Sequence, residues 1–194
     1  MAMLYQGGVN QGGVRDHVAT AILDAAAAVL AEHGDTASMA DVAAAAGVGR
    51  ATLYRYFPNR EHLLHSLGQA ALDDAERRLT EADLDSVPVP EALARLTRAV
   101  VATGAKFVVL MSEHSYLDKD EVAHRLADPI QGVFRRGSED GTFRSDLSPE
   151  SLGHLFGGLL HAAIRLTVEE GLGVERSSAI VTSFFLDGAR ADHH

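Results

Sequence analysis

The segment 50–60 carries the side chains of this sequence that are best suited to binding chemistry. It contains three arginines, two tyrosines and one threonine, and it contains no carboxylate. Guanidinium groups hold phosphates and the acceptor edges of bases, and hydroxyl groups make hydrogen bonds to the same partners. This combination is typical of a surface that contacts a nucleic acid.

Amphipathic helices around this segment would position those side chains. Apolar residues recur at three- and four-residue steps, which predicts helices over 15–33, 39–46, 50–57 and 60–82. The glycine-rich stretch 47–49 leaves room only for a tight turn between the second and third helices. Leu53 and Phe57 lie four residues apart and face inward, so the polar side chains of the third helix point toward solvent.

The charge distribution separates this region from the rest of the chain. With 17 basic and 27 acidic residues, the net charge is -10. Residues 1–60 hold four basic and five acidic side chains, a net of -1, so the other -9 belongs to residues 61–194. An acidic total opposes DNA binding. The segment 50–60 is nevertheless locally positive and is the one patch able to face a phosphate backbone.

The remainder of the chain is also predicted to be helical. A linker with two prolines is expected at 84–90 and a turn at 141–147. Helices are expected over 90–113, 119–139 with a break at Asp128-Pro129, 149–170 and 174–191. No strand pattern and no internal repeat is present, so we predict an all-α fold.

A composite motif connects the second, third and fourth predicted helices. It reads Met39-Ala40-Asp41-Val42-Ala43, Ala46-Gly47-Val48, Thr52-Leu53-Tyr54-Arg55-Tyr56-Phe57 and Pro58-Asn59-Arg60-Glu61, followed by Leu63-Leu64. This motif resembles the DNA-binding signature of the tetracycline-repressor (TetR) family over about 50 residues. The resemblance implies an N-terminal three-helix helix-turn-helix domain and a C-terminal helical domain for ligand binding and dimerisation.

The resemblance also implies a role for individual positions. The residues that would face the major groove are Arg50, Ala51, Thr52 and Tyr56, with Arg50 best placed for guanine. Phosphates would be held by Ser38, Tyr54 and Arg60, and Arg55 suits either contact. Two positions depart from the family pattern: Gly49 stands where the family commonly has a capping Ser, and Ala40 where some members have a base-reading Arg.

Histidines and apolar residues in the C-terminal half suggest a ligand pocket. Its candidate lining residues, which suit a protein core equally well, are Phe107, Met111, His114, Phe134 and His161. His154 and His161 lie seven residues apart on one helix face, but cysteine is absent and no spacing closes a chelate. We therefore predict no metal site and no cofactor, and we expect a small, largely apolar effector.

The last two predicted helices carry more apolar surface than one core face needs. By resemblance, they would form a four-helix interface in a homodimer. The candidate interface residues are Leu152, Phe156, Gly157, Leu160, Ile180 and Phe184. A two-fold dimer would place two recognition helices about one turn of DNA apart, which predicts a palindromic operator.

We predict three regions along the chain. These are a disordered arm at 1–14, a helix-turn-helix domain at 15–60 that continues into the helix 60–82, and an effector and dimerisation domain at 84–191. The absence of cysteine and of any apolar run long enough to cross a bilayer predicts a soluble, cytoplasmic protein without a membrane partner.

The predicted function is a ligand-responsive transcriptional regulator, by resemblance a repressor, that binds a double-stranded DNA operator and is released by an effector. The alternative, suggested by Gly49, Ala40 and the acidic total, is a helical protein that binds small molecules without binding DNA. No nucleophile elbow, phosphate-binding loop or dinucleotide fingerprint is present, so we do not expect an enzyme.

Overall fold

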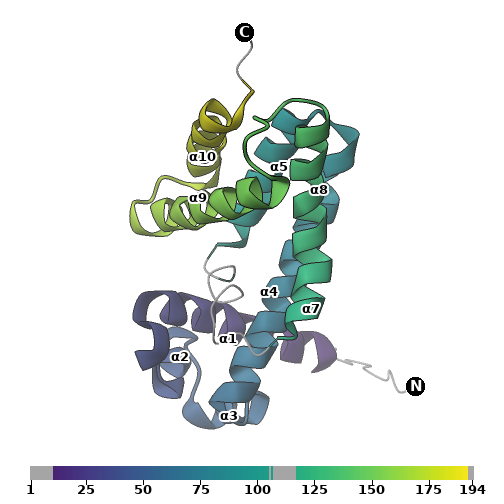
Figure 1. Ribbon diagram of the computed structural model, residues 1–194. Coiled ribbons are helices and arrows are strands. Elements are labelled where there is room, and N and C mark those ends of the chain that lie inside the picture. Colours follow the sequence, from purple (N-terminus) through teal and green to yellow (C-terminus); the bar gives the residue numbers. More distant parts are fainter. Residues whose placement is uncertain (1–10, 105, 107–116, 192–194) are drawn as a thin grey trace, which may run out of the picture. The chain divides into compact units, whose positions relative to one another are not determined.

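The computed structural model describes residues 11–104, 106 and 117–191 of the chain. All regular elements in this part of the chain are helical, which confirms the predicted all-α fold (Figure 1). The chain forms two compact units, Met1–Leu63 and Leu64–His194. None of the described helices combines the length and apolarity that a membrane crossing requires.

The first unit is built from three helices and a short 3₁₀ turn. Its elements are α1 (Gln11–His33), η1 (Gly34–Thr36), α2 (Met39–Ala45) and α3 (Arg50–Tyr56). Gly34 and Gly47 end α1 and α2 with backbone φ angles of 54° and 65°, a region that glycine enters without strain. The helix α1 begins at Gln11, within the segment 1–14 that the sequence predicts to be a disordered arm.

The long helix α4 (Arg60–Ala82) begins in the first unit and continues in the second. It ends before Asp83, whose left-handed backbone (φ 46°) turns the chain into the 3₁₀ segment η2 (Leu84–Ser86). The helix α5 (Val89–Thr103) follows at once, with Pro90 in its first turn, where the missing N–H has no helical partner to lose. The predicted linker 84–90 is thus ordered, because Leu84 and Val89 are buried in the core.

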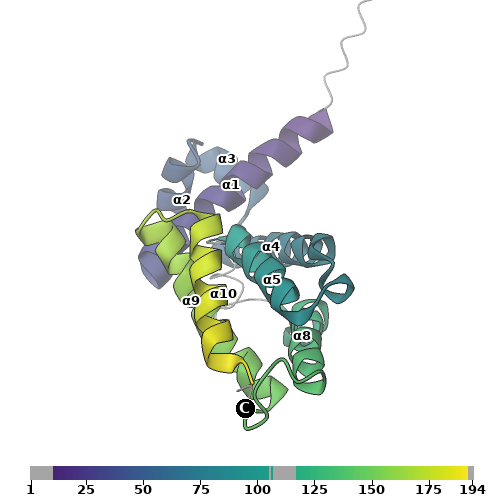
Figure 2. The same cartoon turned by 90° about the horizontal axis from the view of Figure 1, so that it is seen from above.

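The core of the second unit is centred on four phenylalanines. Phe134 comes from α8 (Asp128–Glu139), Phe156 from α9 (Pro149–Glu169), Phe185 from α10 (Val174–Ala189) and Phe143 from the turn after α8. Their ring centroids lie 5.0–6.0 Å apart in tilted, edge-to-face and stacked pairs. The helix α10 contacts both α5 and α9, and the view in Figure 2 shows these helices side by side.

A π-helical turn replaces the break that the sequence predicts at Asp128-Pro129. The helix α7 (Lys119–Val122) runs through η3 (Ala123–Ala127) directly into α8. Proline lacks an N–H and its ring crowds the carbonyl four residues earlier, so a wider turn before Pro129 lets the helix continue. The predicted helical span 119–139 is confirmed. At the position of the expected break the chain stays helical, and only the hydrogen-bond pattern changes from α-helical to π-helical.

Two glycines of α8 provide a matched test of the core packing. A Cβ at Gly137 would overlap the buried ring of Phe143 and lie 3.0 Å from Val89 Cγ1, whereas a Cβ at Gly132 would lie 4.0 Å from its nearest neighbour, Arg135 Nη2. We expect Gly137→Ala to lower the free energy of unfolding by about 1–3 kcal/mol. Gly132→Ala should raise it by about 0.5–1 kcal/mol.

Urea denaturation of both variants measures the two effects. A stabilised Gly137→Ala protein would show that the Phe143 ring does not occupy this position.

Candidate DNA-binding surface and regulatory contacts

The helix α2 begins with a complete capping box. The Oγ atom of Ser38 accepts a hydrogen bond from the Asp41 N–H at 3.2 Å, and the Ser38 N–H donates to Asp41 Oδ2 at 2.9 Å. The Ser38 hydroxyl also donates to Asp41 Oδ2 at 2.6 Å. These bonds from Ser38 lower the pKa of the Asp41 carboxyl, so the carboxylate stays ionised at neutral pH. The hydroxyl predicted to touch a phosphate is therefore already engaged within the cap.

The helix α3 divides into a buried face and an exposed face. Leu53 is 0% exposed and Phe57, directly after the helix, is 4% exposed. The residues with solvent-facing side chains are Arg50, Ala51, Tyr54 and Arg55, while Thr52 and Tyr56 are half-buried. The guanidinium carbon of Arg55 lies 5.4 Å from the centroid of the Tyr56 ring, a cation–π distance that orients both groups.

The turn between α2 and α3 is set by Gly47 and Gly49. Gly49 is the N-cap of α3 in an extended conformation (φ -70°, ψ 150°), and no side chain caps this helix. In the part of the chain that the structure describes, no atom lies within 4 Å of a Cβ built at Gly49, so a serine would fit there. No described side chain therefore satisfies the N-terminal N–H groups of α3 through a cap.

The start of α4 is tied to the first unit by two side chains. Asn59 Oδ1 accepts a hydrogen bond from the His62 N–H at 2.7 Å, which caps the helix. The guanidinium of Arg60 donates through Nη1 to the carbonyl oxygen of Ala37. Arg60 therefore has a structural contact that the sequence did not predict, and its remaining donors are those that a phosphate can use.

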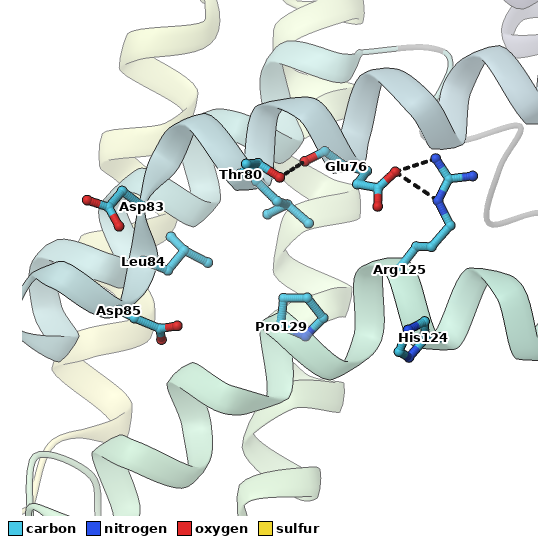
Figure 3. A pocket seen from close by; sticks show the side chains of 9 residues that line it. Glu76, Thr80, Asp83, Leu84, Asp85, His124, Arg125 and Pro129 are labelled. Atoms are coloured by element: carbon cyan, nitrogen blue, oxygen red, sulfur yellow. Dashed lines mark hydrogen bonds and ion pairs between the residues drawn. The ribbon is translucent and has the colours of Figure 1, made fainter.

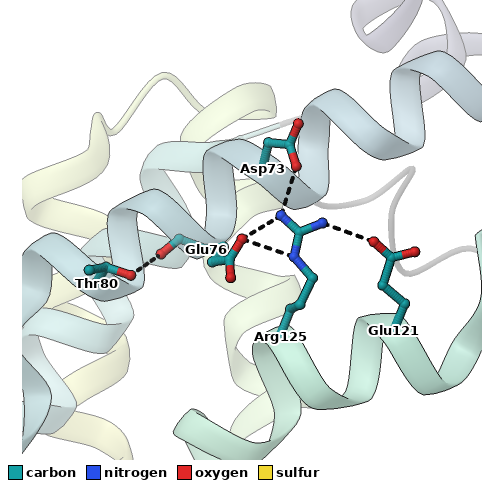
Figure 4. A network of polar contacts seen from close by, with 5 residues as sticks. All are labelled: Asp73, Glu76, Thr80, Glu121 and Arg125. Carbon is teal, nitrogen blue, oxygen red and sulfur yellow. Dashed lines mark hydrogen bonds and ion pairs between the residues drawn. The ribbon is translucent and has the colours of Figure 1, made fainter.

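A second polar centre lies where α4 meets the π-helical turn. Arg125 donates through Nε to Glu76 Oε2 at 2.9 Å, through Nη2 to Asp73 Oδ1 at 2.7 Å and through Nη1 to Glu121 Oε1 at 3.1 Å (Figure 4). The hydrogen bond to Glu76, followed by that to Asp73, raises the pKa of the guanidinium further above its ordinary value. This network joins α4 to α7 and η3, which no sequence motif indicated.

A cleft of about 330 Å³ opens beside this network, between the C-terminal half of α4 and the segment η3–α8 (Figure 3). Its lining residues are Glu76, Leu79, Thr80, Asp83, Leu84, Asp85, His124, Arg125 and Pro129. Glu76 and Arg125 both line the cleft, and Arg125 donates a hydrogen bond to Glu76. A molecule in the cleft would therefore contact the ion pair that links α4 to η3.

Most of the predicted ligand-pocket residues are not placed by the structure. Phe107, Met111 and His114 lie outside the described residues. Phe134 is fully buried in the aromatic core, and His161 is exposed on α9. Among the described residues, no group of three or more His, Asp or Glu side chains is arranged to hold a metal ion.

The predicted dimer-interface residues differ in their exposure in the single chain. Leu152, Phe156 and Leu160 are at most 3% exposed, because this face of α9 packs into the subunit's own core. Ile180 and Phe184 of α10 are 44% and 70% exposed, and Gly157 is also exposed. The sequence missed Leu155, which is 57% exposed on the other apolar face of α9.

The exposed apolar side chains border a groove between α9 and α10. It has a volume of about 340 Å³ and is lined by Leu147, Leu152, Leu155, Gly158, Leu159, Phe184, Phe185, Gly188 and Ala189. No atom of the described residues lies within 4 Å of a Cβ built at Gly158 or Gly188, so these glycines leave an open recess beside the large exposed ring of Phe184.

Comparisons with known proteins show which proteins the chain is similar to. Residues 22–67 match the sequence model of the family described as bacterial regulatory proteins, tetR family. The chain is 34% identical over 152 residues to the transcriptional repressor LfrR of Mycolicibacterium smegmatis, covering 78% of this chain and 80% of that protein. It is 28% identical over 188 residues to the transcriptional repressor KstR2 of Rhodococcus jostii, covering 90% and 92%.

A solved structure gives the same result for the fold. The crystal structure of the TetR-like regulator LfrR from Mycobacterium smegmatis in complex with proflavine matches with a TM-score of 0.68 and 30% sequence identity. The match covers 91% of this chain and 99% of that chain, so it extends well beyond the N-terminal segment that the family model recognises.

The Arg125 network yields a stability prediction. Arg125→Gln removes a guanidinium whose side chain is 19% exposed and leaves three carboxylates without their shared partner. We expect a loss of about 1–2 kcal/mol in the free energy of unfolding, because hydrogen bonds to charged groups are worth more than neutral ones. Arg135→Gln, on the exposed surface of α8, is the control and should change stability by less than about 0.5 kcal/mol.

Thermal unfolding at low and high salt separates the two variants. If Arg125→Gln and Arg135→Gln change the unfolding temperature equally, the network does not stabilise the second unit.

Proposed function

This chain belongs to the TetR family of DNA-binding transcription regulators, and from that premise we propose that it is a ligand-responsive repressor acting as a homodimer on a palindromic operator. The observation that carries this proposal is the exposed, carboxylate-free face of α3, held outward by the burial of Leu53 and Phe57. Residues 15–60 would form the DNA-binding domain, and residues 84–191 would bind the effector and dimerise.

The recognition helix of this proposal is α3. Arg50 and Ala51 are exposed at its N-terminal end, the end that enters the major groove in helix-turn-helix proteins, and Thr52 and Tyr56 complete the same face. Tyr54 is 48% exposed and would meet the phosphate backbone together with the free donors of Arg60. Bases would be read mainly by Arg50, because a guanidinium makes two hydrogen bonds to guanine.

Dimerisation would use the apolar face formed by α9 and α10. Leu155, Ile180 and Phe184 are large apolar side chains with high exposure on neighbouring helices, and water contact of such a patch is unfavourable. An isologous contact would place Phe184 of each subunit near the recess that Gly158 and Gly188 leave in the other. The two-fold axis of this dimer is the reason for expecting a palindromic operator.

Effector control would act through α4, which begins in the first unit and continues in the second. The relative LfrR has been crystallised with proflavine, which supports a small organic effector for this chain as well. Arg125 attaches the second-unit half of α4 to η3 through Glu76 and Asp73. An effector that moves η3 would therefore move α4 and with it the start of α4 that Asn59 and Arg60 tie to the first unit.

A second function is a small-molecule-binding helical protein that has lost operator binding. It is favoured by the missing side-chain cap at Gly49 and by the Ser38 hydroxyl, which is already bound to Asp41. Both features remove phosphate contacts that the proposed regulator would use. Selection of bound sequences from a random DNA pool distinguishes the two functions, because only a regulator enriches a palindrome.

The operator-binding face yields a prediction with two arginine variants. Arg50→Ala should relax base preference and weaken binding to the selected operator by about 1–3 kcal/mol, since a base contact is lost. Arg60→Ala should weaken binding to all sequences alike and reduce the slope of log K against log salt by about one, since a phosphate contact is lost. Fluorescence anisotropy at several salt concentrations measures both.

Arg135→Ala is the matched control, because Arg135 is exposed on α8 in the second unit. If the Arg50 and Arg60 variants bind DNA like the parent protein, the assignment of this face is wrong.

The dimer face yields a separate prediction. Phe184→Asp places a charge in the centre of the proposed interface and should raise the dimer dissociation constant at least about 30-fold, since loss of a central aromatic contact costs about 2 kcal/mol or more. Ala31→Asp adds the same charge at an exposed position of α1 and should leave it unchanged. Analytical ultracentrifugation over a concentration series measures the constant, and an unchanged dimer for Phe184→Asp would refute the interface.

A further inference from the structure

A cleft of about 520 Å³ in the second unit is lined by three arginines. Arg78 comes from α4, and Arg95 and Arg98 come from α5, while Val174 and Glu175 at the start of α10 close the other side. Its remaining lining residues are Glu81, Ala82, Ala99 and Ala102. The small alanine side chains leave the space between the guanidinium groups open.

Each of the three guanidinium groups is only partly used. Arg78 donates through Nε to Asp74 at 2.9 Å, and Arg98 donates through Nε to both oxygens of Glu175 at 3.0 Å. Arg95 donates through Nε to Glu91 at 3.0 Å and through Nη1 to the Ala82 carbonyl at 3.2 Å. No described residue accepts a hydrogen bond from either Nη group of Arg78 or Arg98, or from Nη2 of Arg95, so five N–H-bearing groups remain for a ligand.

The charges in the cleft favour an anion. Of its two acidic side chains, Glu81 is paired with Arg77 outside the cleft, at 2.9 Å. Asp74 and Glu91, which pair with Arg78 and Arg95, do not line the cleft. Among the described residues, Glu175 is therefore the one lining carboxylate that contacts these arginines. The lining side chains, three arginines and two glutamates, sum to a charge of +1, on a chain whose net charge is -10.

A second cleft of about 430 Å³ shares Arg98 and Glu175 with the first and continues between α5 and α10. It is lined by Ser178, whose residue is 3% exposed and whose Oγ has no hydrogen-bond partner among the described residues. The neighbouring Thr182 hydroxyl, by contrast, donates to Thr97 Oγ1 at 3.0 Å. A buried hydroxyl without a partner is unfavourable, and a polar ligand atom would satisfy it.

We propose that these joined clefts bind a small organic molecule that carries a phosphate or diphosphate group. The phosphate lies among Arg78, Arg95 and Arg98, whose planar guanidinium groups match its oxygens in paired hydrogen bonds. The organic part extends toward Ser178. Glu175 occupies the phosphate position in the ligand-free protein and is displaced on binding. Its pair with Arg98 is weak, because the two side chains are 74% and 51% exposed.

The proposed ligand cleft and the proposed dimer face lie on different sides of α10. Ser178 precedes Ile180 by two residues, as Thr182 precedes Phe184, and two residues correspond to about 200° around a helix. The cleft would thus stay open in the dimer, and its ligand does not depend on the proposed operator function.

The test uses the full chain with pyrophosphate and adenosine diphosphate as probes in isothermal titration calorimetry. Both should bind with one site per chain, and adenosine diphosphate should bind at least as tightly as pyrophosphate. Arg98→Gln should weaken both at least tenfold, whereas Arg135→Gln, which removes the same charge from exposed α8, should not.

Glu175→Gln gives the sharper result, because it removes the carboxylate that competes for Arg98. It should strengthen pyrophosphate binding several-fold, while Glu139→Gln, which removes an exposed carboxylate of α8, should not. Circular dichroism confirms that each variant is folded. The proposal would be overturned if neither probe binds, or if Arg98→Gln binds them as tightly as the parent chain. It would also be overturned if Glu175→Gln and Glu139→Gln change pyrophosphate affinity equally. If the chain binds pyrophosphate but not adenosine diphosphate, the proposal that the ligand has an organic part near Ser178 is wrong.

Discussion

The burial of Leu53 and Phe57 is the constraint on which the proposed DNA-binding surface depends. Both side chains pack in the core of the first unit, and the helical repeat then fixes which residues of α3 remain outside. Burying two such side chains contributes about 3–6 kcal/mol in transfer free energy, far more than any polar contact on the opposite face. Arg50, Tyr54 and Arg55 are therefore exposed because of where the apolar residues are.

In the second unit, each buried aromatic ring contributes more to stability than each ion pair. The phenylalanine cluster sets the positions of α8, α9 and α10, since each buried ring contributes about 1.5–3 kcal/mol. The ion pairs of Arg125 involve carboxylates that are 39–68% exposed, so each is worth about 0–1 kcal/mol. Weak, specific contacts of this kind suit the proposed role of α4, in which the helix shifts when an effector binds.

Local signals explain where sequence reasoning succeeded. The bounds 60–82 of α4 were predicted because Asn59 caps the helix and Leu63 and Leu67 begin a regular apolar stripe. The segment 84–90 was misread as a linker because its prolines resemble a boundary, while the burial that orders Leu84 and Val89 comes from distant residues. The break expected at Pro129 did not account for a π-helical turn, which has no simple sequence pattern.

By itself, the sequence determined the helical class, the helix-turn-helix and the outward face of α3, because periodicity, caps and glycine turns act within a few residues. Tertiary structure alone decided which apolar face of α9 is buried: Phe156 packs into the core and Leu155 is left outside. It also brought Arg78 of α4 and Arg98 of α5 into one cleft and Arg125 onto Glu76. These side chains are separated by 20 residues or more, and helix packing, which no local pattern records, sets their distances.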